Sequence, residues 1–474
     1  MHLVWNESLP GTIGPALVGR EPRNAGFAPA IKIFDCAYAF SADGSGARAM
    51  LRPSAETPGS INVTTFSTSA ASPAAPDSAL SWFRLVISVT IASIGAVGMW
   101  SVVVALPAMQ AEFGVDRAAA SLPYTATMLG FAAGGVITGR LADRYGVTMP
   151  LILSAICYCI GYVAAGQSGS LWPATLAHGL MGIGTSTSFA PLMADISHWF
   201  ARRRGIAVTI AASGNYIGGA IWPPVVQHFI AADGWRTTYT GIGVFCLVTM
   251  IPLSLMMRRQ IAAHHADEAS AEAARRQAAL PLSPTALQVL LCIAGLACCV
   301  AMSMPQVHIV AYCGDLGYGV ARGADMLSLM LGLGIISRIA SGFIADRIGG
   351  VATLLLGSVL QGVALFLYLF FDSLFSLYVI SGLFGLFQGG IVPMYAIIIR
   401  EYFPAGEAST RVGLVIMMTI LGMAGGGWMS GAIFDATGSY QAAFLNGLAW
   451  NLLNVLIAAF LLLRSRSGAR LATA

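Results

Sequence analysis

From Arg84 onward the chain alternates long apolar stretches with short polar segments. Each apolar stretch has roughly twenty residues, enough for a helix that rises about 1.5 Å per residue to cross a bilayer core of ~30 Å. The pattern therefore predicts twelve membrane-spanning helices. Their predicted ranges are 84–109, 118–140, 148–167, 171–198, 205–230, 237–257, 286–312, 322–344, 351–371, 374–400, 410–433 and 440–463.

The polar segments divide the chain into five parts. Residues 1–80 are rich in Ala, Ser, Gly and Pro and contain no apolar stretch of spanning length, so a disordered N-terminal extension is expected there. Residues 81–257 and 285–464 are each expected to form a half of six helices. The polar residues 258–284 would form a cytoplasmic linker loop, and residues 465–474 a cytoplasmic tail.

One cluster of glycine and charged residues occurs once in each half. The segments GRLADRYG and GFIADRIG share the spacing Gly-x-x-x-Asp-Arg-x-Gly, at a separation of about two hundred residues that exceeds solenoid repeats. The residues of these two clusters are Gly139, Asp143, Arg144 and Gly146, and Gly342, Asp346, Arg347 and Gly349. The fold class is therefore predicted as an all-α membrane protein with two six-helix halves. Transporters with such repeats bind substrate near the midplane, between the halves.

The composition supports this class. The chain is 57% hydrophobic and only 10% charged, with a mean hydropathy of +0.75, whereas a soluble domain carries roughly 25% charged residues. Arginine is concentrated in the short segments on one side of the predicted spans, which places both termini in the cytoplasm. No catalytic constellation, metal-ligand spacing or phosphate loop stands out. We therefore predict no enzyme, metal, cofactor or nucleic-acid partner.

The repeated clusters resemble the loop signature of the major facilitator superfamily, and the resemblance covers essentially Arg84 to Arg464. A narrower segment, WFARRRGIAVTIAASGNYIGGAIWPP at residues 199–224, is similar to the monocarboxylate-transporter and oxalate–formate-exchanger branch. The resemblance implies a secondary transporter in a bacterial inner (plasma) membrane. It also implies that Asp143 and Asp346 close a cytoplasmic gate by meeting the N-termini of neighbouring helices, where a carboxylate is favoured.

Arg338 is the charged residue within the apolar part of the span 322–344, and the matching position in the first half is Gly135. A guanidinium within a membrane costs ~2.5–3.5 kcal/mol, and its planar fork can bind a carboxylate through two parallel hydrogen bonds. Carboxylate carriers of the resembled branch bear an arginine one helical turn before the motif glycine, here Gly342. The alternative is an arginine that reaches the cytoplasmic surface or caps a neighbouring helix.

Four other polar residues are expected near mid-depth and complete the predicted substrate site with Arg338: His308, Tyr395, Asn215 and Tyr216. His308 is the candidate proton partner, since histidine ordinarily titrates near neutral pH, and a neutral core histidine is the alternative. Residues 84–109 lack the acid that animal monocarboxylate carriers have in their first span. Residues 410–433 lack the lysine of the oxalate–formate exchanger. A single cation favours a monocarboxylate over a dicarboxylate.

The predicted function is secondary active transport of a small organic anion, a monocarboxylate, by alternating access. Its expected partners are that anion, protons as the coupling ion, and the lipid bilayer. Two alternatives stay open: efflux of drug-like or amphipathic compounds, and a transport-dead membrane sensor on the same fold. The complete gating cluster in each half argues against the sensor.

Overall fold

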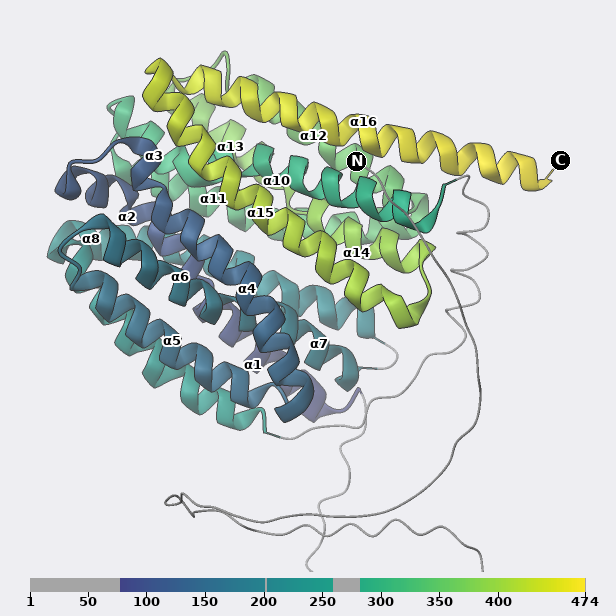
Figure 1. Cartoon of the computed structure of the whole chain (residues 1–474), viewed down its shortest axis with the longest axis horizontal. Coiled ribbons are helices and arrows are strands. Elements are labelled where there is room, and N and C mark those ends of the chain that lie inside the picture. The colour runs from purple at the N-terminus through teal and green to yellow at the C-terminus, as the bar shows by residue number, and fades with distance from the viewer. Residues whose placement is uncertain (1–76, 201–202, 259–281, 474) are drawn as a thin grey trace, which may run out of the picture. The chain divides into compact units, whose positions relative to one another are not determined.

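The computed structural model describes residues 77–200, 203–258 and 282–473. The predictions for residues 1–80 and for the linker 258–284 fall almost wholly outside these ranges. Within them the regular structure is helical, as the apolar pattern predicts (Figure 1). The last helix continues to Thr473, through residues that were expected to form a tail.

The N-terminal half contains helices α1 to α8. Their bounds are α1 Ala79–Gly95, α2 Val97–Phe113, α3 Arg117–Ala120, α4 Leu122–Tyr145, α5 Thr148–Gly166, α6 Leu171–Thr187, α7 Ala190–Trp199 and α8 Arg204–Met256. Helix α8 contains two predicted spans. Its apolar part Gly205–Met256 has 52 residues, or ~78 Å of helix, far more than a bilayer core needs. The backbone leaves helical geometry at Gly234, whose φ of 78° is a conformation that glycine adopts readily, and we place the reversal of the chain there.

The C-terminal half contains helices α10 to α16. Their bounds are α10 Pro284–Asp315, α11 Val320–Ile348, α12 Gly350–Leu367, α13 Leu374–Gln388, α14 Ile391–Tyr402, α15 Ala405–Thr437 and α16 Tyr440–Thr473. Over the described ranges, ten segments are long and apolar enough to cross a membrane. The segment Gly205–Met256 counts as two spans when it is divided at Gly234, and the α6–α7 pair forms one more. The total is then consistent with the twelve predicted spans.

Two spans, one in each half, are interrupted near a proline. Pro191 has no N–H, so it cannot donate to the carbonyl of Thr187, where α6 ends and α7 follows. Pro393 cannot donate to the carbonyl of Gly389 in the same way, and Gly389 lies between α13 and α14. Each half therefore contains one span that is interrupted at a proline, and the second of these breaks leaves a backbone carbonyl available for a side chain.

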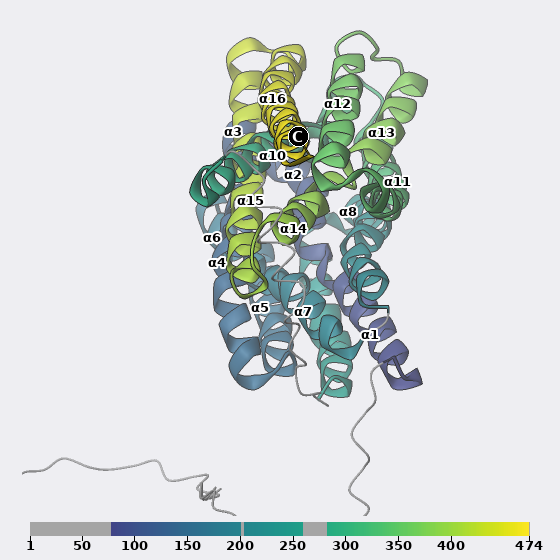
Figure 2. The same cartoon turned by 90° about the vertical axis from the view of Figure 1, so that its right-hand side faces the viewer.

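The two halves lie side by side, with α1–α8 on one side and α10–α16 on the other (Figures 1 and 2). They meet along two seams, one between α8 and α11 and the other between α15 and the α3–α4 segment. Glycine allows the second seam to be close. A Cβ at Gly431 would lie 2.9 Å from the carbonyl oxygen of Arg117 and 3.1 Å from the backbone nitrogen of Ala118. Small residues of this kind permit close helix approach in membranes.

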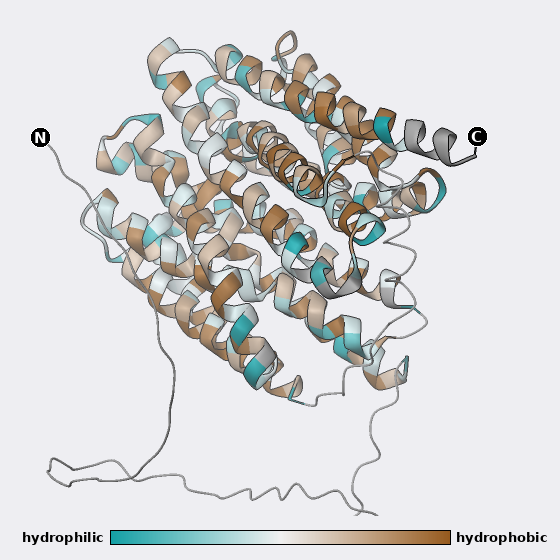
Figure 3. Ribbon diagram, turned by 45° about the vertical axis from the view of Figure 1, so that its right-hand side comes forward, coloured by the Kyte–Doolittle hydropathy of each residue, from teal (hydrophilic) through white to brown (hydrophobic). Residues whose placement is uncertain are grey.

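The outer surface of the bundle is apolar. Large hydrophobic side chains such as Phe375, Leu176 and Trp172 are 80%, 75% and 67% exposed. Figure 3 shows hydrophobic residues along the helices. A soluble protein rarely exposes so much apolar surface, whereas lipid covers it in an integral membrane protein.

Candidate functional site

A cavity of about 70 Å³ lies between the two halves, next to both spans that are interrupted at a proline. Such a volume has room for several water molecules or a small organic group. Its wall is mostly apolar, and among the described residues Arg338 is the only charged one that lines it. The lining residues are Met99, Trp100, Phe131, Phe189, Asn215, Tyr216, Cys299, Met302, Gln306, Arg338, Val392, Ile416, Thr419, Ile420 and Met423.

Arg338 is held in place by backbone carbonyls from both halves. Its Nη1 donates to the carbonyl of Ala212 on α8 at 2.9 Å, and its Nε donates to the carbonyl of Gly389 at 3.3 Å. The Gly389 carbonyl is the one that Pro393 leaves without a helical donor. The guanidinium carbon lies 4.3 Å from the centre of the Tyr216 ring, in a cation–π contact. Gly389 is the C-cap residue of α13, so Arg338 caps a neighbouring helix, which was the alternative interpretation, and it also lines the cavity.

The charge of Arg338 is buried and has no acidic partner. Only 5% of the residue is exposed, and over the ranges that the structure describes no carboxylate lies within ion-pair distance of it. A buried cation is usually paired with an anion, since leaving it uncompensated costs several kcal/mol or shifts its protonation. Because Arg338 lines the cavity, an anion that enters the cavity could pair with it.

Of the other predicted substrate-site residues, the structure brings Asn215 and Tyr216 to the cavity wall with Arg338. Tyr395 does not line the cavity. It is fully buried, and its hydroxyl donates to Asn454 Oδ1 at 3.1 Å, toward α16. The Asn454 amide in turn donates to Ser358 Oγ at 2.7 Å, so Tyr395 belongs to a polar network inside the C-terminal half.

His308 does not line the cavity either. It lies further along α10, fully buried, with Nε2 at 2.8 Å from the carbonyl of Gly427 on α15. A carbonyl can only accept, so this nitrogen is assigned as the donor, and Nδ1 has no partner among the described side chains. The ring centre of Tyr440 is 5.9 Å away. His308 is therefore a neighbour of the contacts that close one end of the bundle.

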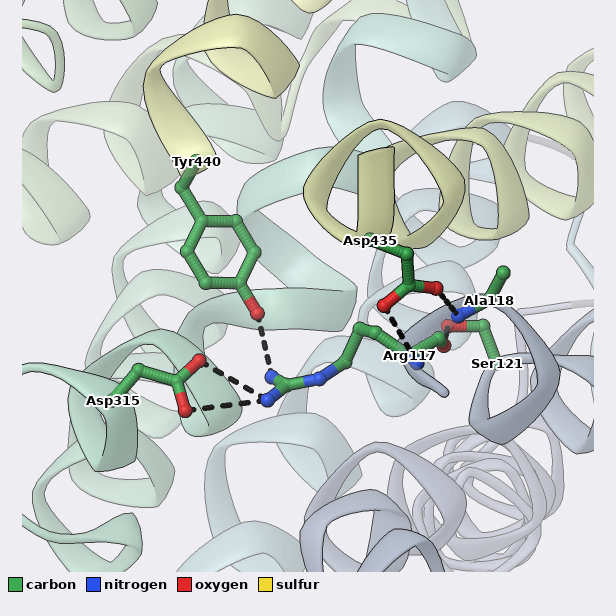
Figure 4. Close-up of polar contacts among 6 residues, drawn as sticks. All are labelled: Arg117, Ala118, Ser121, Asp315, Asp435 and Tyr440. Atoms are coloured by element: carbon green, nitrogen blue, oxygen red, sulfur yellow. Dashed lines mark hydrogen bonds and ion pairs between the residues drawn. The ribbon is translucent and has the colours of Figure 1, made fainter. Parts of the chain in front are cut away.

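At that end, which we call the Arg117 end, side chains of the two halves bind each other (Figure 4). Arg117, at the start of the second span, is 7% exposed and donates to the hydroxyl of Tyr440 at 2.6 Å. Its Nη2 forms an ion pair of 3.1 Å with Asp315, at the end of α10. Its guanidinium also lies over the Phe434 ring, 5.0 Å from the ring centre.

Asp435, in the last turn of α15, completes this group. Its two carboxylate oxygens accept from the backbone N–H groups of Arg117 at 2.9 Å and of Ala118 at 2.6 Å (Figure 4). These are among the first N–H groups of a helical segment, which have no acceptor within their own helix and carry partial positive charge. Arg117, Asp315, Asp435 and Tyr440 together form what we call the inter-half lock.

The repeated clusters lie at the opposite end, which we call the Asp346 end. Asp346 and Arg347 are exposed, and within the described part of the chain Asp346 forms no hydrogen bond or ion pair. The side chain of Asp143 is outside what the structure describes. The carboxylate that meets the N-terminus of α12 belongs to Glu401, whose Oε1 accepts from Gly350 N–H at 3.1 Å. Among the described residues, Asp346 makes no contact with a helix N-terminus in this conformation.

Sequence reasoning did not find the lock. Neither Arg117 nor Asp315 was among the predicted site residues. One signal was present: Arg117 is one of few cations on its side of the predicted spans, and an acidic residue closely follows two spans of the C-terminal half, Asp315 after 286–312 and Asp435 after 410–433. Gln306, which lines the cavity, was also missed because a glutamine in an apolar helix carries no directional signal of its own.

Comparison with known proteins agrees with this architecture. The sequence model of the Major Facilitator Superfamily matches residues 88–372 and 341–473. Monocarboxylate transporter 13 of Rattus norvegicus is 28% identical over 69% of this chain and 75% of its own length. Agnestins efflux protein AgnL12 of Paecilomyces divaricatus is 24% identical over 73% of this chain and 79% of its own length.

A solved structure has the same fold. It is a bacterial homolog of the human lysosomal transporter Spinster in an inward-facing, unoccupied conformation. The TM-score is 0.63, with 15% sequence identity over 83% of this chain and 98% of that one.

Proposed function

We propose that this chain, which belongs to the Major Facilitator Superfamily, is a secondary transporter that moves a small organic anion, a monocarboxylate, by alternating access. The family consists of transporters rather than enzymes, in agreement with the sequence-based prediction. One observation carries the choice of an anion: Arg338 is a buried guanidinium on the wall of the inter-half cavity with no carboxylate partner among the described residues. The carboxylate of the substrate would supply the missing negative charge.

The contacts at the two ends support alternating access. The inter-half lock closes the Arg117 end, while Asp346 at the other end is exposed and unpaired within the described ranges. Release of the lock would open the cavity at the Arg117 end. Engagement of the Asp143 and Asp346 clusters would close it at the Asp346 end. We place the Arg117 end outside a bacterial inner membrane and both termini in the cytoplasm, on the distribution of arginine between the two ends.

The test of the anion proposal is uptake of labelled monocarboxylates into proteoliposomes that contain the full chain. Arg338→Lys keeps the charge but loses the planar fork, so the KM should rise about ten-fold or more. Arg338→Ala should abolish saturable uptake. Arg322→Lys is the matched control, because Arg322 is on the same helix but is exposed and away from the cavity, and its uptake should be unchanged. Uptake at the unaltered rate by Arg338→Ala would contradict the proposal.

Efflux of an amphipathic compound is the second candidate. The cavity wall favours it in one respect, because Trp100, Phe131 and Phe189 provide large aromatic surfaces. The same proteoliposomes discriminate between the candidates when a lipophilic cation is offered beside the carboxylates. Transport of the cation that persists or becomes faster in Arg338→Ala would favour efflux, because a buried positive charge repels a cation and its removal does not hinder one.

A further inference from the structure

Gln306 is a buried amide that lines the cavity and binds nothing in the described part of the chain. It is on α10, only 2% exposed, and takes part in no hydrogen bond or ion pair there. Buried amides are nearly always hydrogen-bonded, since an unmet donor or acceptor costs free energy. Gln288, on the same helix, follows the rule and donates to the carbonyl of Arg411 at 3.3 Å. Gln388 also lacks a partner, but it does not line the cavity.

The positions of Gln306 and Arg338 along the bundle follow from a close contact between α10 and α11. A Cβ on Gly323 would lie 2.5 Å from the Cα of Val310, so these two residues are level. Gln306 is four residues before Val310, and Arg338 is fifteen residues after Gly323 on a helix of opposite direction. Their Cα atoms therefore differ in depth by ~16 Å of helix rise.

The usual lean of helical side chains directs these two residues toward each other across this distance. Side chains on a helix lean toward the N-terminus of their own helix. Because α10 begins at the Asp346 end and α11 begins at the Arg117 end, Gln306 leans toward Arg338 and Arg338 leans toward Gln306. These long side chains take up much of the separation. What remains between the amide and the guanidinium suits a chain of a few carbon atoms.

We propose that Gln306 is a specificity-determining residue: its amide binds a neutral oxygen of the substrate, a few carbon atoms from the carboxylate that binds Arg338. The proposal rests on the anion transport proposed above. The oxygen belongs to a ketone or hydroxyl rather than to a second carboxylate, because Arg338 is the only charged residue among the described residues that line the cavity. Met302, Ile420 and Met423 provide apolar surface for the carbon chain between the two polar groups.

A matched pair of acids tests this assignment. In 4-oxopentanoate a ketone oxygen occupies the place of a methyl group in 4-methylpentanoate, so the two acids have nearly the same size and charge. Initial uptake rates into proteoliposomes give kcat/KM for each acid. The unaltered protein should prefer the oxo acid about ten-fold, the value of one hydrogen bond. Gln306→Met should remove the preference by raising the KM of the oxo acid, with little change for the methyl acid. Gln288→Met is the control and should keep the preference.

The outcomes separate this inference from the anion proposal. Equal rates for the two acids in the unaltered protein, no uptake of the oxo acid, or an unchanged preference in Gln306→Met would each overturn the role of Gln306. Arg338→Lys should weaken transport of both acids to a similar extent, because each binds it through the same carboxylate. If Arg338→Lys has no effect on either acid, the anion proposal fails instead.

Discussion

Asp435 Oδ2 accepts a hydrogen bond of 2.6 Å from the backbone N–H of Ala118, 317 residues away in the chain. A carboxylate at the end of one half thereby meets the N-terminus of a spanning segment in the other half. This is the contact that was expected of Asp143 and Asp346 at the opposite end of the bundle. An anion interacts favourably with the N–H groups at a helix N-terminus. The contact of Asp435 therefore stabilises the closed state of the Arg117 end.

Asp435→Asn should weaken the closed state of the Arg117 end. An amide keeps one acceptor oxygen but loses the negative charge that interacts favourably with the helix N-terminus. The closed state should therefore be destabilised by about 1 kcal/mol, which lowers its population relative to the open state roughly five-fold. Cys299 on the cavity wall is the reporter. Its labelling by a membrane-impermeant thiol reagent added at the Arg117 end should become several-fold faster, and Cys299→Ser identifies the background from other thiols. Labelling at the unaltered rate would show that Asp435 has no part in closure.

His308→Gln should remove the stimulation of uptake by an inward proton gradient and leave exchange of labelled for unlabelled substrate largely intact. Glutamine can still donate to the Gly427 carbonyl, but it cannot take up a proton. A proton on Nδ1 of His308 would add a positive charge beside Tyr440, close to Arg117 and its partners Asp315 and Asp435. We therefore expect His308 to act on the lock rather than on the substrate. Uptake by the variant that still follows the gradient would exclude it as the proton partner.

Asp195→Asn should destabilise the N-terminal half. Asp195 accepts from Arg84 through two hydrogen bonds, of 2.7 Å to Nε and 2.8 Å to Nη2, and Arg84 is 3% exposed. Removing one charge of such a pair leaves the other buried and uncompensated, at a cost of about 3–5 kcal/mol. Thermal unfolding of the purified protein in detergent should show a lower Tm. The double variant Arg84→Met with Asp195→Leu should lose less, and an equal or larger loss would argue against uncompensated charge as the cause.

Gly426→Ala should destabilise the C-terminal half, whereas Gly425→Ala should not. A Cβ on Gly426 would lie 2.7 Å from the carbonyl oxygen of Val300 and would overlap Ser303 Oγ, so α15 and α10 would have to move apart. A Cβ on Gly425 would meet nothing within 4 Å, and alanine favours a helix by about 1 kcal/mol over glycine. The adjacent residue is thus a matched control. Comparable Tm values for the two variants would show that the close contact of these helices is not required.

Much of the fold can be predicted from sequence because each span is a local property. A run of apolar residues of sufficient length must cross the bilayer as a helix that satisfies its own backbone, whatever its neighbours are. The repeated Asp-Arg clusters then indicate two related halves without reference to any contact. Arg338 was found for the same reason, since a charge in the middle of an apolar span is unusual in any fold.

The contacts between spans were decided by the tertiary structure. Tyr395 and Gln306 are both polar residues within spans, yet Tyr395 faces α16 and Gln306 faces the cavity. Which face of a helix meets the cavity depends on how neighbouring helices pack against it, and span length carries no information on that rotation. The lock has the same origin, because Asp435 and Ala118 meet only after the two halves have associated. The sequence alone therefore determined which segments cross the membrane and where a charge is buried. The packing of the halves decided which polar groups face the cavity and which end is closed, because it joins residues hundreds of positions apart.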